Sequence, residues 1–131
     1  MARASQRYAK LLKAQKLVKA RDEAELEGSI NTRLALKDED KFLFSLTEKG
    51  QMPDFFNPLL VANRLERNAR KEAILATLIV KQRKTLLQSS RRYDVIDKKR
   101  KAALEAEERK DLSNMLEEYV AAKIVKDTSL G

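Results

Sequence analysis

The stretch that decides the fold is LATLIVKQRKTLLQSSRRYDVIDKKRKAA, residues 75–103. Stepping through it alternately by four and three residues gives a heptad seam in which most positions are apolar. The seam positions are Leu75, Ile79, Gln82, Leu86, Ser89, Tyr93, Ile96, Arg100 and Ala103. This periodicity predicts a helix that packs along another helix as a coiled coil, with polar interruptions in the seam.

The helix around this seam extends in both directions. Asn57-Pro58 is a start signal, because an asparagine cap accepts a backbone N–H and proline has no N–H to leave unpaired at the first helical position. No glycine or further proline follows before about Lys126. We therefore expect a helix over residues 58–126, about 100 Å long at 1.5 Å per residue, and a short tail at 127–131.

Another long helix is expected before it, over about residues 5–49. Lys49-Gly50 suits its last turn and its cap, and residues 50–57, with Pro53, would form the connection. Its expected apolar stripe comprises Tyr8, Leu11, Leu12, Leu17, Val18, Ala24, Leu26, Ile30, Leu34, Phe42, Leu43 and Leu46. The predicted fold class is all-α: residues 1–131 form a single long antiparallel two-helix coiled-coil hairpin, with the second helix longer and projecting at the C-terminus.

The hairpin predicts its own register. A connection centred near Asp54 places residue i opposite about residue 108 − i, so that Met1 lies near Glu107 and Arg21 near Leu87. The first helix is then too short to cover the second, and about 20 residues from Glu108 onward project.

The expected projecting end has an apolar pattern of its own. After Glu107 the phase of the seam shifts, as a stutter would produce, to Leu112, Met115, Leu116, Tyr119, Val120 and Ile124. An uncovered apolar stripe predicts a partner-binding or dimerisation face. A fold-back before Leu112 would instead bury the stripe in a three-helix bundle.

Composition excludes several functional classes. Of the 131 residues 37% are charged and 43% hydrophobic, which favours a thin seam over a thick core. The absence of cysteine and histidine removes thiol nucleophiles, imidazole bases and the commonest zinc ligands. Carboxylate pairs such as Glu105 with Glu108, or Asp111 with Glu117, would need an enclosed pocket. We therefore expect no enzyme, no catalytic residue, no metal and no cofactor.

Positive charge is concentrated in two segments. Residues 1–21 contain seven Lys/Arg and no acid, and residues 81–101 contain nine against two acids, so the predicted register brings +7 and +7 side by side. Such a cluster fits an acidic protein surface or a polyanion, although charges fanned into solvent remain an alternative. A basic helical protein that binds RNA, the ribosome or other nucleic acid is a second hypothesis, and a generic coiled-coil assembly adaptor a third.

The sequence also bears on localisation. The acid-free start is a feature of organellar presequences, but the helical pattern continues into residues 22–27 without a cleavage-like break. No apolar run approaches the roughly 18 residues of a membrane span. We expect a soluble cytoplasmic protein.

Near its start the chain contains the basic segment Arg7-Tyr8-Ala9-Lys10-Leu11-Leu12, followed by a long helix and a short break. The second helix contains a charged stretch from Arg91-Arg92-Tyr93 to Glu108-Arg109. In this arrangement the chain resembles FliJ and the YscO-type central stalk proteins of flagellar and virulence type III export. The resemblance implies a non-enzymatic stalk that docks in a hexameric export ATPase ring and couples it to the membrane export gate, peripheral to that complex. The ATPase-facing residues it implies are Arg3, Arg7, Lys10, Arg91, Arg92, Leu112, Leu116 and Tyr119. The gate-facing residues it implies are Leu65, Ala69, Ala73 and Ala76.

Overall fold

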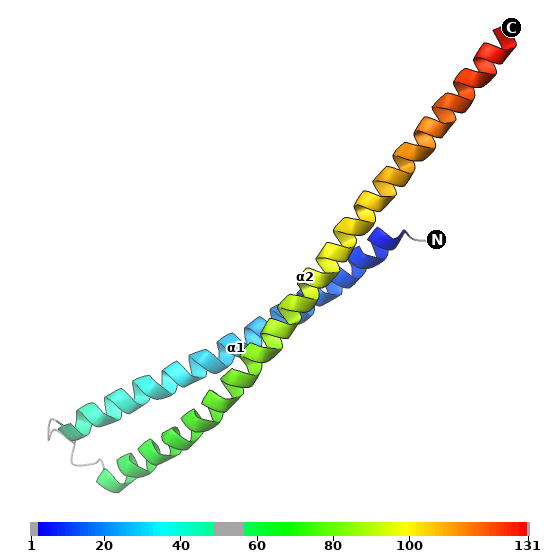
Figure 1. Cartoon of the computed structure of the whole chain (residues 1–131). Helices are drawn as coiled ribbons and strands as arrows, with labels where there is room; N and C mark the ends of the chain where they lie inside the picture. Colours follow the sequence, from blue (N-terminus) through cyan, green and yellow to red (C-terminus); the bar gives the residue numbers. More distant parts are fainter. Residues whose placement is uncertain (1–2, 49–56, 131) are drawn as a thin grey trace. The chain divides into compact units, whose positions relative to one another are not determined.

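The structure, a computed structural model, describes residues 3–48 and 57–130. Helix α1 spans Ala4–Glu48 and helix α2 spans Pro58–Leu130 (Figure 1), and the described residues contain no strand. The predicted all-α hairpin with a longer second helix is confirmed. Neither α1 nor α2 has a stretch both long and apolar enough to cross a lipid bilayer.

Both helices begin with a cap that the local sequence supplies. At α1, the side chain of Gln6 accepts a hydrogen bond from the N–H of Arg3 at 3.3 Å, which is one half of a capping box. At α2, Asn57 Oδ1 accepts a hydrogen bond from the N–H of Leu59 at 2.9 Å. The predicted asparagine cap before Pro58 is therefore confirmed.

The ends of the helices differ in part from the prediction. Helix α2 continues to Leu130 rather than ending near Lys126, because no glycine or proline interrupts it before Gly131. The hydroxyl of Thr128 donates to the carbonyl of Ile124 at 2.6 Å, and that of Ser129 to the carbonyl of Lys126 at 2.9 Å, so both polar residues join the helix. The predicted stop at Lys49-Gly50 lies outside the described residues, as does most of the predicted connection.

The chain divides into two compact units, each containing part of both helices. One unit comprises Met1–Lys16 with Arg91–Gly131, and the other comprises Leu17–Ser90. In the first, Ser5 contacts Glu107. In the second, Asp22 contacts Ser89, and Asp40 contacts Asn68. The order of these contacts makes the helices antiparallel within the second unit.

Side-chain burial along α2 follows the predicted heptad. All nine predicted seam positions between Leu75 and Ala103 are buried or half-buried. The same spacing continues in both directions through residues that the prediction left out, which are Val61, Leu65, Asn68, Glu72 and Glu107. We call this row of α2 residues, from Val61 to Glu107, the inner seam.

The predicted apolar stripe of α1 is wrong at five positions, one of which is the exposed Ala24. Leu11, Leu17, Leu34 and Phe42 are between 52% and 73% exposed. The buried or half-buried residues instead follow a heptad in which many positions are polar: Ser5, Tyr8, Leu12, Gln15, Lys19, Asp22, Leu26, Ser29, Arg33, Leu36, Asp40 and Leu43. Selecting positions by apolarity missed this register, because several of its polar side chains find polar partners on α2.

The helices are held together by a thin apolar core and a series of polar contacts. Among the described residues, only Leu43, Val61 and Ile79 are buried hydrophobic side chains. Asn68 donates from Nδ2 to Asp40 Oδ1 at 2.9 Å, and these two residues lie at the register that was predicted. Ser5 contacts Glu107 about one helical turn beyond the predicted position, a difference that a long side chain can span.

Candidate partner-binding surfaces

None of the described residues covers the last part of α2. Every residue from Glu108 to Ser129, which we call the projecting segment, is exposed. The predicted apolar residues lie on it, with Leu112 58%, Met115 65%, Leu116 57% and Tyr119 67% exposed. The projecting end is confirmed, and α2 continues as one helix through the point at which a fold-back was considered.

The apolar stripe lies on the side of α2 opposite the inner seam. Leu112 and Leu116 follow Ala103 and Glu107 of the inner seam by nine residues each. Nine residues are two and a half turns of an α-helix, so each leucine is rotated by half a turn from its inner-seam counterpart. A partner can therefore approach the stripe from the side that α1 does not occupy.

The half-turn offset defines a second heptad row on the outer side of α2. Within the unit that contains residues 91–131, this outer seam comprises Arg91, Val95, Lys98, Ala102, Glu105, Arg109, Leu112, Leu116, Tyr119, Lys123 and Lys126. Four of the predicted partner-binding residues, Arg91, Leu112, Leu116 and Tyr119, therefore share one side of one helix.

The two basic segments, residues 1–21 and 81–101, each extend over both units. In the unit that includes both chain ends, residues 3–16 contain five cations and no acid, and residues 91–101 contain six cations and two acids. Residues 102–129 contain four cations and seven acids. A basic paired part is thus followed by a projecting part with a net negative charge.

Most of the cations in residues 3–16 and 91–101 have no acidic partner in the described part of the chain. Arg100 and Lys101 pair with Asp97 at 2.9 and 3.2 Å, and Arg3 pairs with Asp111 at 3.1 Å. Eight exposed cations make no ion pair with a described residue: Arg7, Lys10, Lys13, Lys16, Arg91, Arg92, Lys98 and Lys99. Of the predicted partner-binding cations, Arg3 is therefore engaged within the chain, and Arg7, Lys10, Arg91 and Arg92 are available.

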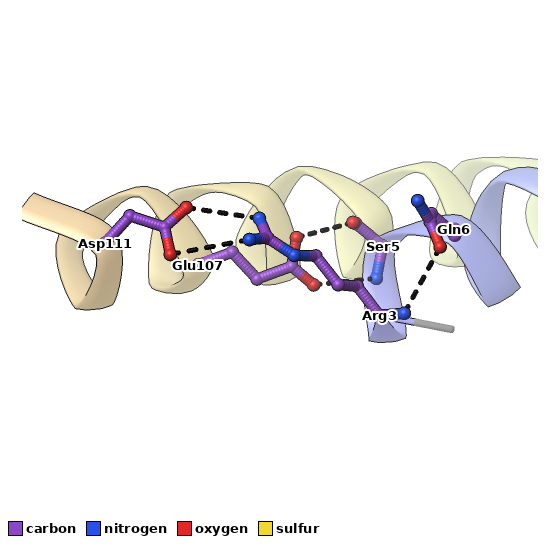
Figure 2. Close-up of polar contacts among 5 residues, drawn as sticks. All are labelled: Arg3, Ser5, Gln6, Glu107 and Asp111. Carbon is purple, nitrogen blue, oxygen red and sulfur yellow. Dashed lines mark hydrogen bonds and ion pairs between the residues drawn. The ribbon is translucent and has the colours of Figure 1, made fainter. Parts of the chain in front are cut away.

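Contacts with α2 fix the start of α1 (Figure 2). Glu107 accepts hydrogen bonds from the hydroxyl of Ser5 at 2.5 Å and from its N–H at 3.1 Å, and Arg3 reaches both carboxylate oxygens of Asp111. The two hydrogen bonds from Ser5 hold the pKa of Glu107 below its usual value of 4.5. Hydrogen bonds from Arg100 and then Lys101 likewise lower the pKa of Asp97. Both carboxylates therefore favour the charged form.

The predicted gate-facing residues do not form one exposed surface. Ala69 and Ala73 are exposed, whereas Leu65 is a half-buried inner-seam residue and Ala76 is half-buried beside that seam. The acidic pairs considered for catalysis, Glu105 with Glu108 and Asp111 with Glu117, are all exposed. They lie on an open helix surface rather than in an enclosed pocket.

No family model, curated protein or solved structure matches this chain.

Sequence reasoning located the projecting segment but missed two features of it. The first is the outer seam, which the nine-residue offset between Ala103 and Leu112 could have revealed. The second is the role of Glu107, which continues the inner heptad seven residues after Arg100 and carries the last inner-seam contact with α1. An acidic residue at that position gave no apolar signal, although its place in the heptad was readable.

Proposed function

We propose that this chain is a non-catalytic stalk or adaptor of the type III export class. Its projecting segment docks on a hexameric export ATPase, and another part of the chain contacts the export gate at the membrane. The protein then works at the periphery of a membrane-bound complex and couples two partners through its paired helices.

The observation that carries the proposal is the apolar stripe, which residues 3–48 and 57–130 leave uncovered. Leu112, Leu116 and Tyr119 are each more than half exposed and are turned away from α1. Burying such residues against a groove is favourable by roughly 25 cal/mol per Å² of apolar surface. A helix that presents them at heptad spacing has the form used in helix-in-groove recognition.

The basic residues that precede the stripe on the same side of α2 support a partner with acidic residues. Arg91 and Lys98 belong to the same outer seam as Leu112, and both are exposed and form no ion pair with a described residue. Opposed charges across an interface speed association and fix orientation, while exposed pairs add little affinity. The leucines and the tyrosine should therefore contribute most of the affinity, and Arg91 and Lys98 should influence the rate of association.

Capture of the ATPase by the full chain tests the proposal. Leu116→Asp or Tyr119→Asp should abolish capture, because either change places a charge in the middle of the apolar contact. Asn114→Asp is the matched control: Asn114 is exposed, lies one heptad beyond Glu107 on the inner side of α2, and receives the same carboxylate. Capture that survives both stripe variants, or is lost equally in Asn114→Asp, rejects this assignment.

Binding to a polyanion is a second candidate function, and the eight free cations of residues 7–16 and 91–99 favour it. Phosphate neutralisation by clustered Lys/Arg releases counterions, so affinity for RNA or DNA should fall steeply with salt. Replacing Arg7, Lys10, Arg91 and Arg92 with glutamine should reduce the salt dependence as well as the affinity. A mobility shift that is absent at low salt removes this candidate.

A further inference from the structure

The ionisable residues around the apolar stripe have a symmetry that the proposed function does not use. Before the stripe, the outer side of α2 carries Glu105, Glu108 and Arg109. After it, the same side carries Lys123, Lys126 and Asp127. Two acids and one base therefore precede the stripe, and two bases and one acid follow it, so the two ends have opposite net charge.

We infer that two copies of this chain pair antiparallel through the outer seam of their projecting segments. In the register that centres the stripes on one another, Leu112 of one copy meets Tyr119 of the other. The two-fold axis passes beside Leu116. The same surface is used twice, as a two-fold interface requires.

Charge selects this orientation. In the same register, Glu105 of one copy lies opposite Lys126 of the other, and Glu108 lies opposite Lys123. The two-fold axis repeats both pairs, which gives four attractive pairs in the dimer. A parallel arrangement would place each of these residues beside its own copy, so that acids would meet acids and bases would meet bases.

The geometry leaves room for the second copy. All residues from Glu108 to Ser129 are exposed, and the stripe is half a turn away from the α1-facing side of α2, so α1 stays in place when the copies pair. The interface spans residues 105–126, about 33 Å of helix at 1.5 Å per residue. A single helix pair of this length falls at the small end of specific interfaces, below about 1,200 Å², where association is transient.

A transient pair has a consequence for recognition. The copies and an external partner compete for Leu112, Leu116 and Tyr119, so the paired form covers the stripe when no partner is present. Two copies should pair whatever the identity of the external partner, and the pairing should be measurable with the purified chain alone.

Cysteine cross-linking of the full-length chain tests the pairing, because the natural sequence contains no cysteine. Leu116→Cys should form a disulfide-linked dimer under mild oxidation, because the two residues meet at the axis. Leu112→Cys and Tyr119→Cys should each cross-link poorly alone and efficiently when mixed. Asn114→Cys, on the opposite side of the helix, measures random collision.

Each outcome of the cross-linking decides the question. If the Leu112→Cys chain forms a disulfide-linked dimer as efficiently as the Leu116→Cys chain, the copies are parallel and the inference is overturned. If the Leu116→Cys chain cross-links no better than the Asn114→Cys chain, the copies do not pair through the stripe, and the stripe binds an apolar groove on another protein instead. Either result would leave the ATPase capture experiment unaffected, since that experiment measures a different complex.

Charge reversal provides an independent measurement that does not use cysteine. Changing Glu105 and Glu108 to lysine should weaken self-association, measured by sedimentation, by about tenfold, because four attractive pairs become repulsive. Adding Lys123→Glu and Lys126→Glu to the same chain should restore it, and this fourfold variant has the net charge of the natural protein. Failure of the second pair of changes to restore association would overturn the proposed register.

Discussion

Glu107 of α2 accepts two hydrogen bonds from Ser5 of α1, one from the hydroxyl and one from the backbone N–H. The first N–H groups of a helix have no acceptor within that helix, and a negative charge is favourable beside them. Gln6 accepts the N–H of Arg3 within α1, and the carboxylate of Glu107 adds from α2 an acceptor for the N–H of Ser5.

Replacing Glu107 with glutamine should loosen the first turn of α1. The amide keeps one acceptor oxygen but loses the charge, so one of the two hydrogen bonds from Ser5 weakens and the other is lost. Hydrogen exchange of the amides of residues 5–8 should become faster. Glu108→Gln, one residue further along and exposed, is the control, and equal exchange in the two variants would contradict the capping role.

The stability of the hairpin should fall in acid. Hydrogen bonds lower the pKa values of Glu39, Asp97 and Glu107, with Arg64 the main partner of Glu39. A carboxylate whose pKa is lowered by folding stabilises the folded state fully above its ordinary pKa, and this contribution is lost as the pH falls through the lowered value. The urea midpoint, followed by circular dichroism, should therefore decrease below about pH 4.5.

The comparison with Glu39→Gln separates this effect from general charge repulsion. The natural protein should be more stable than this variant at pH 7, where the carboxylate is charged and bound to Arg64. The difference should disappear at low pH, where the carboxyl group is protonated in both the folded and unfolded states. A difference that stays constant with pH would contradict the assignment.

Two isoleucines on α2 allow a direct test of the thin core. Ile79 is 3% exposed in the inner seam, whereas Ile74 is 68% exposed on the outside. Ile79→Ala should lower the free energy of unfolding by about 2 kcal/mol or more, through lost burial and the cavity left behind. Ile74→Ala should change it by less than about 0.5 kcal/mol. Equal losses in urea denaturation would mean that the inner seam is misassigned.

Asn68 should set the register at a cost in stability. It is fully buried, its Nδ2 donates to Asp40, and its Oδ1 has no partner among the described residues. Asn68→Leu should raise the free energy of unfolding by about 1 kcal/mol, because an unpaired buried acceptor is removed. Asn63→Leu, an exposed asparagine on the same helix, should have little effect.

The register itself can be read from a cysteine pair that replaces Asp22 and Ser89, which are in contact in the same unit as Asn68. The disulfide should form efficiently with Asn68 present and less efficiently with leucine there, because a polar seam residue excludes alternative alignments. Undiminished cross-linking in the Asn68→Leu chain would show that the register is fixed elsewhere.

The sequence was most informative where physical signals were local or periodic. Asn57-Pro58 identified the start of α2 because capping depends on adjacent residues, and the steps from Leu75 to Ala103 identified the inner seam. The first helix was harder to predict, because Asp22, Asp40 and Ser5 are covered only through partners distant in the sequence. Apolarity alone then favoured Leu17 and Phe42, which are exposed.

The candidate surface was also predicted only in part. The uncovered stripe could be predicted from the unequal lengths of the two helices. The ion pair between Arg3 and Asp111 could not, because the spacing of residues along the sequence does not indicate a side-chain contact between positions 108 residues apart. The sequence spacing already placed the stripe half a turn away from Glu107. The contact between Glu107 and Ser5 then showed that Glu107 faces α1, so the stripe faces away from it.

The half-turn between Glu107 and Leu116 separates two tasks along a single helix. Substitutions at positions 112, 116 and 119 can alter what the protein recognises without touching the residues on which α1 packs. A chain shortened just before Leu112 would still contain every contact between its two helices described above. The residues for partner recognition and the residues for helix pairing can therefore be redesigned separately. A foreign binding sequence joined after residue 111 would extend from a hairpin whose helix pairing is unchanged.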